Sequence, residues 1–160
     1  MMIYRITLIL SILLFSCNTT GKLQDNEPYI DEHGMEVTTE ETDAEIIFQL
    51  KNTNDYPVYL SRPDQLTIQK QEGGNWEKVR ILYCPCGASC PPPREFVSLQ
   101  TNDFVRLKWN KKESWCVDVD HQVIPETKER KASQGNYRML IQYGQQKKKQ
   151  TKTYYEFKLN

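Results

Sequence analysis

Four cysteines in the second half of the chain are the residues best suited to chemistry. Cys84, Cys86 and Cys90 lie close together beside a run of three prolines, and Cys116 follows later. In an exported protein such thiols form disulfide bonds by default. A bond between Cys84 and Cys86 would close a very tight ring around the intervening proline. We therefore expect one of these two to pair with Cys90 and the other with Cys116, so that two disulfides hold the loop.

A metal site is the competing interpretation of the same thiols. The thiolates of Cys84, Cys86 and Cys90, completed by Cys116 and His121, are ligands that Zn²⁺ and Cu⁺ accept. Structural zinc sites more often place about two to four residues between paired cysteines, whereas only one residue separates Cys84 from Cys86. We expect disulfides and no bound metal or other cofactor, and copper or zinc handling stays an alternative function.

The fifth cysteine, Cys17, follows a short apolar run. Arg5 is the only charged side chain before it, and residues 6–15 are almost entirely apolar. This run is too short to span about 30 Å of hydrocarbon, and behind a basic start it indicates a secretory signal. The run ends in Leu14-Phe15-Ser16-Cys17, which resembles the lipobox of bacterial lipoproteins. That resemblance implies a signal peptide at residues 1–16 and acyl chains such as palmitate on Cys17.

Acylation at Cys17 would decide where the protein is located. Several acyl chains anchor a protein stably, whereas one chain binds membranes only marginally. The expected location is the bacterial cell envelope, with the outer membrane or the periplasmic face of a membrane favoured. Residues 17–35 are polar and contain scattered Gly and Pro, as a flexible tether would. The domain that must position the cysteines is then expected at residues 36–160, with a Cys-rich loop at 84–94.

Apolar residues of this domain recur with a period of two, which is the pattern of half-buried β-strands. Turn residues separate the strands at short intervals, and no window shows a helical stripe. These features predict an all-β fold, an antiparallel immunoglobulin-like β-sandwich of about 7–9 strands. The expected core includes Phe48, Leu50, Leu107, Trp109, Ile141 and Phe157.

Four segments carry a resemblance to known families. They read AEIIFQLKNTNDYPVYL, LTIQKQEGGNWEKV, VRLKWN and GNYRMLIQY. They resemble immunoglobulin-like domains of the bacterial envelope and, less closely, the bacterial intracellular proteinase inhibitor family, which is a small β-sandwich. The shared features are a first strand ending in Asn, a hairpin with Gly before Trp, a strand ending in Trp, and Gly-x-Tyr opening a late strand.

Composition and motifs exclude several functions. Twenty-one basic and twenty-one acidic residues give a net charge of zero, which argues against nucleic-acid binding. Neither a G-x-S-x-G nucleophile motif nor a phosphate-binding Gly loop occurs. We therefore expect a non-enzymatic binding or assembly module, anchored to membrane lipid through Cys17, whose partner is another envelope protein or peptide.

The Cys-rich loop at residues 84–94, which the two expected disulfides would hold (the stapled loop), is the expected binding surface, because loops on a rigid scaffold commonly carry function. Its expected binding residues are Pro91, Pro92, Pro93 and Arg94. The resemblance to the inhibitor family implies an alternative, in which the loop inhibits a protease and Arg94 or a neighbour enters the protease pocket.

Overall fold

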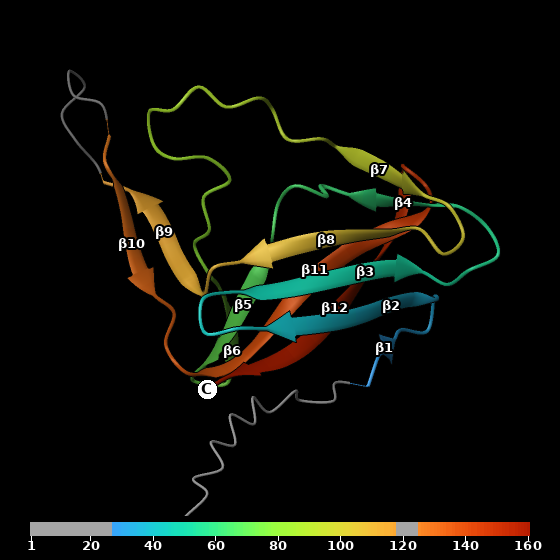
Figure 1. Cartoon of the computed structure of the whole chain (residues 1–160), viewed down its shortest axis with the longest axis horizontal. Coiled ribbons are helices and arrows are strands. Elements are labelled where there is room, and N and C mark those ends of the chain that lie inside the picture. The colour runs from blue at the N-terminus through green and yellow to red at the C-terminus, as the bar shows by residue number, and fades with distance from the viewer. Residues whose placement is uncertain (1–26, 118–124) are drawn as a thin grey trace, which may run out of the picture.

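The structure is a computed structural model that describes residues 27–117 and 125–160 (Figure 1). Within these residues it contains twelve β-strands and no helix. The strands are β1 (Tyr29–Ile30), β2 (Met35–Glu41), β3 (Ile46–Asn52), β4 (Val58–Ser61), β5 (Ile68–Glu72), β6 (Asn75–Lys78), β7 (Phe96–Leu99), β8 (Phe104–Trp109), β9 (Lys112–Cys116), β10 (Thr127–Lys131), β11 (Gly135–Gln146) and β12 (Lys149–Leu159).

The strands form two main antiparallel sheets and a separate hairpin. The first sheet has the order β1-β2-β3-β8, and among the described strands β9 pairs only with β10. In the second sheet, β11 pairs with β12 along one edge and with both β5 and β4 along the other, and β6 and β7 lie outside these. Figure 1 shows β2, β3 and β8 running side by side in front of β11 and β12, with the β9–β10 hairpin standing apart. The predicted all-β antiparallel sandwich is confirmed.

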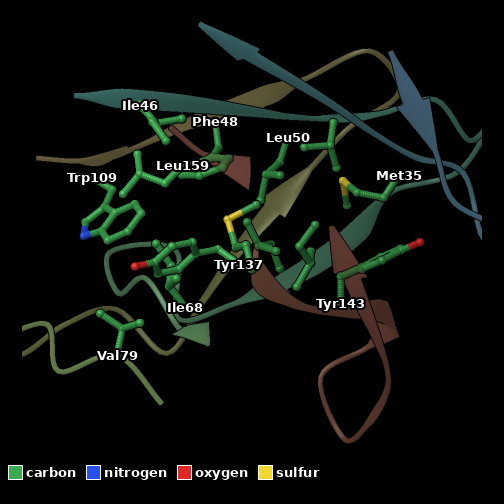
Figure 2. Packing of buried hydrophobic residues seen from close by; sticks show 14 of the residues in the cluster. Met35, Ile46, Phe48, Leu50, Ile68, Val79, Trp109, Tyr137, Tyr143 and Leu159 are labelled. Atoms are coloured by element: carbon green, nitrogen blue, oxygen red, sulfur yellow. The ribbon is translucent and has the colours of Figure 1, made fainter. Parts of the chain in front are cut away.

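Inward side chains from both sheets meet in one core (Figure 2). The rings of Phe48 on β3 and Phe157 on β12 lie 5.2 Å apart, and those of Trp109 on β8 and Tyr137 on β11 lie 5.4 Å apart. Among the predicted core residues, Phe48, Leu50, Trp109 and Ile141 are at most 2% exposed, while Leu107 and Phe157 are partly buried against them. The predicted strand phase is therefore confirmed.

The number of strands exceeds the expected seven to nine. Besides β1, which falls in the expected tether, the sequence prediction missed β2, whose second half is Thr and Glu, and β10, which reads Thr-Lys-Glu-Arg-Lys. Neither has sustained apolar alternation, because only the first half of β2 is buried and β10 is largely exposed in the separate hairpin. These segments are strands because their backbones pair with a neighbouring strand: β2 pairs with β3, and β10 pairs with β9.

The expected tether boundary at residue 35 is wrong, because the fold begins at β1. Asp31 is only 7% exposed, and its carboxylate accepts hydrogen bonds from the Tyr143 hydroxyl at 2.6 and 2.7 Å. The backbone N–H groups of His33 and Met35 also donate to it, at 3.0 and 2.9 Å. Met35 is fully buried. Polar composition therefore concealed an ordered segment at residues 29–35, which we call the N-terminal strap. Residues 1–26, with the signal segment and Cys17, lie outside the described residues.

A buried asparagine closes one end of the sandwich. Asn52 is 0% exposed, and its side-chain N–H groups donate to the carbonyl oxygens of Tyr56, Leu99 and Gln100 at 2.9, 3.1 and 3.2 Å. Its side-chain oxygen accepts from the backbone N–H of Asn54 at 3.0 Å. Since buried polar groups are costly unless paired, Asn52 fixes the β3–β4 turn against the end of β7.

Candidate binding site

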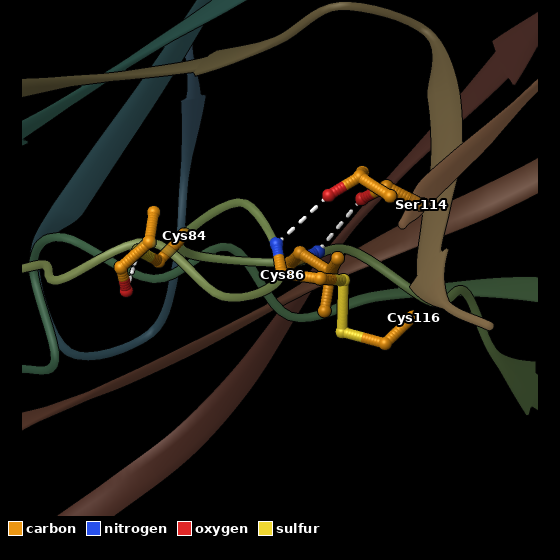
Figure 3. The surroundings of a disulfide bond; sticks show 7 residues. Cys84, Cys86, Ser114 and Cys116 are labelled. Carbon is orange, nitrogen blue, oxygen red and sulfur yellow. Dashed lines mark hydrogen bonds between the residues drawn. A yellow bond between two sulfur atoms is a disulfide. The ribbon is translucent and has the colours of Figure 1, made fainter. Parts of the chain in front are cut away.

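Two disulfide bonds join the Cys-rich loop to itself and to the β9–β10 hairpin. Cys84 bonds to Cys90 with a Cα–Cα distance of 6.2 Å, and Cys86 bonds to Cys116 with a Cα–Cα distance of 5.6 Å. Figure 3 shows Cys86 on the loop turned toward Cys116 at the end of β9. The expected disulfides are present, and Cys84 and Cys86 bond to different partners as expected. The structure assigns Cys84 to Cys90 and Cys86 to Cys116, a choice that the sequence left open.

Hydrogen bonds add to this attachment. The backbone N–H of Leu82 donates to the Ser114 hydroxyl at 2.8 Å, and the N–H of Cys86 donates to the Thr127 hydroxyl at 2.8 Å. Ser114 in turn donates its backbone N–H to the carbonyl of Arg80 at 2.7 Å. The loop has little apolar content to bury, so these bonds and the disulfides take the place of a core in fixing its position.

Arg94, at the end of the loop, is held by Asp64. The Arg94 backbone N–H donates to the Asp64 carboxylate at 3.0 Å, and its Nε donates to the same carboxylate at 2.9 Å. Hydrogen bonds from the Arg94 side chain and backbone lower the pKa of the Asp64 carboxyl to about 2. The Arg94 guanidinium would have to leave this ion pair before it could enter the pocket of a protease.

Within residues 27–117 and 125–160, no side-chain hydrogen bond or ion pair holds the three prolines as Asp64 holds Arg94. Pro91 and Pro92 are exposed, and Pro93 is half-buried. None of them lines the cleft described below, whereas Arg94 does. The structure therefore separates the predicted binding residues into an exposed proline segment and one arginine that belongs to the wall of a cleft.

This cleft, of about 800 Å³, lies between the two sheets on the side where β8 ends the first sheet. One wall is formed by residues 105–108 of β8, and the others by residues 62–67 and 81–83 with Lys78 and Arg94. Its volume falls in the range of about 300–1,000 Å³ that is typical of ligand sites. The residues that line the cleft thus come from separate parts of the chain, and the packing of the two sheets and the position of the stapled loop bring them together.

The cleft is strongly basic although the chain as a whole is neutral. Among the described residues, its lining contains five basic side chains against one acid, Asp64. The basic residues are Arg62, Lys78, Arg94, Arg106 and Lys108. A cleft lined by one sign of charge attracts ligands of the opposite sign. Sequence reasoning identified only Arg94 of this set, because the other four lie in segments that show no cluster in the sequence.

Arg62 occupies a strained backbone position at the cleft. Its φ is 47°, in the left-handed region that costs a non-glycine residue about 1–2 kcal/mol. Two backbone hydrogen bonds hold it there: its N–H donates to the Glu95 carbonyl at 2.8 Å, and its carbonyl accepts from Gln65 at 3.0 Å. Strained residues concentrate at functional sites, so Arg62 supports a role for the cleft.

No protein-family model, no functionally described protein and no solved structure matches the chain. The resemblances to bacterial lipoproteins, to immunoglobulin-like envelope domains and to the proteinase inhibitor family therefore rest on the sequence motifs quoted above.

Two further predictions concern residues outside the described part. Both Cys17, the predicted acylation site, and His121, the predicted alternative metal ligand, lie there. Within residues 27–117 and 125–160 no cluster of three or more His, Cys, Asp and Glu is placed to hold a metal ion. The same residues include no helix that is long and apolar enough to cross a membrane.

Proposed function

We propose that the protein is a lipoprotein of the bacterial cell envelope that binds another envelope protein or peptide and has no enzymatic activity. The observation that carries this proposal is the basic cleft, with a wall that two disulfides hold in place. A site that is already rigid loses less conformational entropy on binding, which favours affinity. Disulfides persist mainly in exported proteins, which agrees with the signal segment and the acylation motif at Cys17.

The structure gives less support to the two alternative functions. Protease inhibition through Arg94 would require breaking its ion pair with Asp64. Copper or zinc handling would require reducing the disulfides, because the sulfur atoms of Cys84, Cys86, Cys90 and Cys116 are all held in disulfide bonds. A count of free thiols in the purified protein, combined with metal analysis, tests the second alternative directly.

Membrane fractionation tests the anchor. The wild-type protein should be found in the membrane fraction with a mass increased by its acyl chains. Cys17→Ser should release it or leave it as an uncleaved precursor, since the acyl acceptor is then missing. An unchanged mass and an unchanged membrane fraction in the Cys17→Ser variant would contradict the lipoprotein assignment.

Site-specific crosslinking in intact cells tests the binding role of the cleft. A photoactivatable side chain at position 78 lies in the cleft wall, and the same side chain at position 128 lies on the exposed hairpin strand β10. A discrete crosslinked product should form from position 78 and not from position 128. Equal crosslinking from both positions would mean that the cleft is not the binding surface.

A further inference from the structure

We propose that the cleft binds an extended acidic segment of the partner protein, and that this segment adds as a new strand to the free edge of β8. This inference rests on the proposed binding function and specifies its ligand and its mode of binding. Addition of a peptide strand to an exposed sheet edge is a general mode of peptide recognition.

The backbone of β8 is available on the side facing the cleft. β8 is the last strand of its sheet and, of the strands that the structure describes, pairs only with β3. In the part of the chain that the structure describes, residues 104–109 make no other backbone hydrogen bond. Side chains alternate between the two faces of a strand, yet four consecutive residues, 105–108, line the cleft. Contact with consecutive residues means that the main-chain edge of β8 itself borders the cleft.

The charges around this edge select an acidic ligand. Arg106 and Lys108 project from the same face of β8, and Arg62 and Lys78 belong to other parts of the lining. Arg106 donates to the neutral side chain of Gln49 at 3.2 Å, and Lys108 lies 3.5 Å from the Glu45 carboxylate. Within residues 27–117 and 125–160, the side chains of Arg62 and Lys78 make no ion pair.

A second copy of the chain does not fit the same edge. Two β8 strands paired edge to edge would place Arg106 and Lys108 of one copy near those of the other, and like charges across a strand pair are destabilising. At the opposite edge β1 is only two residues long and carries no acidic side chain, and the part of β2 that β1 leaves uncovered, residues 38–41, would give a second copy only four residues for pairing. The basic side chains of β8 thus oppose self-association and favour an acidic strand.

The remaining lining defines the alternate positions of the ligand. Leu66, Ile81, Val105 and Leu107 give the cleft an apolar part, and the Tyr83 side chain is 40% exposed beside it. A strand lying along β8 presents one set of side chains to Arg106 and Lys108 and the other set to these apolar residues. The ligand that fits is therefore a segment in which acidic and apolar residues alternate.

Peptide binding to the purified full-length protein, in detergent and with both disulfides intact, tests the proposal. The probe is a fluorescent peptide of alternating Glu and Val, about eight residues long so that it can pair with all six residues of β8. Binding is followed by fluorescence anisotropy at low salt. A peptide of alternating Lys and Val tests the sign of the charge. An N-methylated Glu-Val peptide, which lacks the N–H donors of one edge, tests strand pairing.

We expect the Glu-Val peptide to bind and the Lys-Val peptide not to bind. N-methylation should weaken binding by at least about tenfold, because more than one main-chain hydrogen bond is lost. Arg62→Gly and Lys78→Ala should each weaken it about 2- to 5-fold, the range of exposed ion pairs. Glycine tolerates the positive φ at position 62, so this variant should stay folded. Lys128→Ala, which removes an exposed charge outside the cleft lining, should bind as the wild type does.

Three results would overturn the proposal. Equal binding of the N-methylated peptide would exclude strand addition, and equal binding of the Lys-Val peptide would exclude charge selection. Binding of dextran sulfate that depends on Arg62 and Lys78, with no binding of the Glu-Val peptide, would assign the cleft to a polyanionic glycan instead. The assay does not depend on acylation, so peptide binding by a protein that fails membrane fractionation would refute only the anchor. Correct fractionation and cleft crosslinking without peptide binding would refute only this inference.

Discussion

Tyr143→Phe should destabilise the fold by about 1.5–3 kcal/mol, because it removes the hydroxyl that holds the N-terminal strap. The Tyr143 hydroxyl donates to the buried Asp31 carboxylate at 2.6 and 2.7 Å, and the tyrosine is 2% exposed. A hydrogen bond to a charged group contributes about 1.5–3 kcal/mol. The carboxylate keeps its two backbone donors, from His33 and Met35, so the loss should not exceed that range.

The matched control is Tyr154→Phe, which removes a hydroxyl from a ring that is 36% exposed. That ring packs against the Arg138 guanidinium at 4.0 Å, and phenylalanine preserves this contact. Its cost should stay below about 0.5 kcal/mol, as for most surface changes. Urea unfolding gives both free energies, and hydrogen exchange at Met35 reports on the strap itself. Equal costs for the two variants, or unchanged exchange at Met35 in Tyr143→Phe, would refute this account of the strap.

The same pair predicts a pH dependence on the alkaline side. Burial, together with the hydrogen bond to Asp31, raises the pKa of the Tyr143 phenol above its ordinary value. In the unfolded chain the phenol ionises near pH 10, about where free tyrosine does. The stabilisation is therefore complete below about pH 10 and is lost as the pH rises further. Tyr143→Phe should lose stability less steeply than the wild type above this pH, measured by urea unfolding at several alkaline pH values.

Three further predictions concern the core, the cleft and the loop. Leu107→Ala should cost about 2 kcal/mol in urea unfolding, at the low end for a core leucine because the side chain is only partly buried. Lys108→Ala, on the other face of β8, should cost under about 0.5 kcal/mol, and equal costs would contradict the strand phase. Because the pKa of Asp64 is lowered, its ion pair with Arg94 stabilises the fold above about pH 4 and does so progressively less toward pH 2. Between these pH values the melting temperature of Asp64→Asn should therefore fall less than that of the wild type. Replacing both Cys86 and Cys116 by Ala removes a disulfide with a sequence separation of 30. The free energy of unfolding should fall by about 3–4 kcal/mol, because the unfolded chain gains conformational entropy. An unchanged free energy of unfolding would mean that the disulfide does not restrain the unfolded chain.

Alternation sufficed to predict the strands that bury one face. β3 has the burial pattern of strict alternation over its whole length, and the phase of β8 could be read from its apolar positions. It failed for β2 and β10, where exposed positions carry charged residues on both faces. In such strands the hydrogen bonds to a neighbouring strand, which the sequence does not display, determine the structure.

The strap shows a second limit of reading composition. A polar segment with Gly34 and several acids resembles a tether, and most of the side chains at residues 27–35, the part of it that the structure describes, are indeed exposed. One carboxylate, that of Asp31, decides otherwise, because its partner Tyr143 is 112 residues away in the sequence. A local signal did exist: an Asp followed by residues whose N–H groups can reach its side chain is typical of a turn. Recognising the buried tyrosine as its partner required the fold.

Part of the cysteine pairing, in contrast, followed from local constraints, because the intervening proline argued against a Cys84–Cys86 ring and the expected export favoured full oxidation. Which of the two bonds to Cys90 stayed open in the sequence, and the structure assigns Cys84 to it. The cleft had no such local signature. Arg106 and Lys108 could be placed on the outward face of their strand from the sequence, but only the sheet order shows that this strand has a free edge. Arg62 and Lys78 join them through β4, β6 and the stapled loop, so their proximity depends on tertiary structure alone.

The zero net charge conceals this arrangement because the charges are segregated within one sheet. Acidic residues, among them Glu36, Glu40 and Glu41, lie on β2 near one edge, and Arg106 and Lys108 lie on β8 at the other, with β3 between them. A balanced total excludes a uniformly basic surface, such as a nucleic-acid-binding protein presents, and does not exclude a local basic site. At physiological salt, screening limits the range over which exposed charges interact to a Debye length of about 8–10 Å. Two strand spacings of about 4.8 Å separate β2 from β8, which is about one Debye length, so a ligand in the cleft responds more strongly to the basic residues beside it than to the partly screened acids of β2.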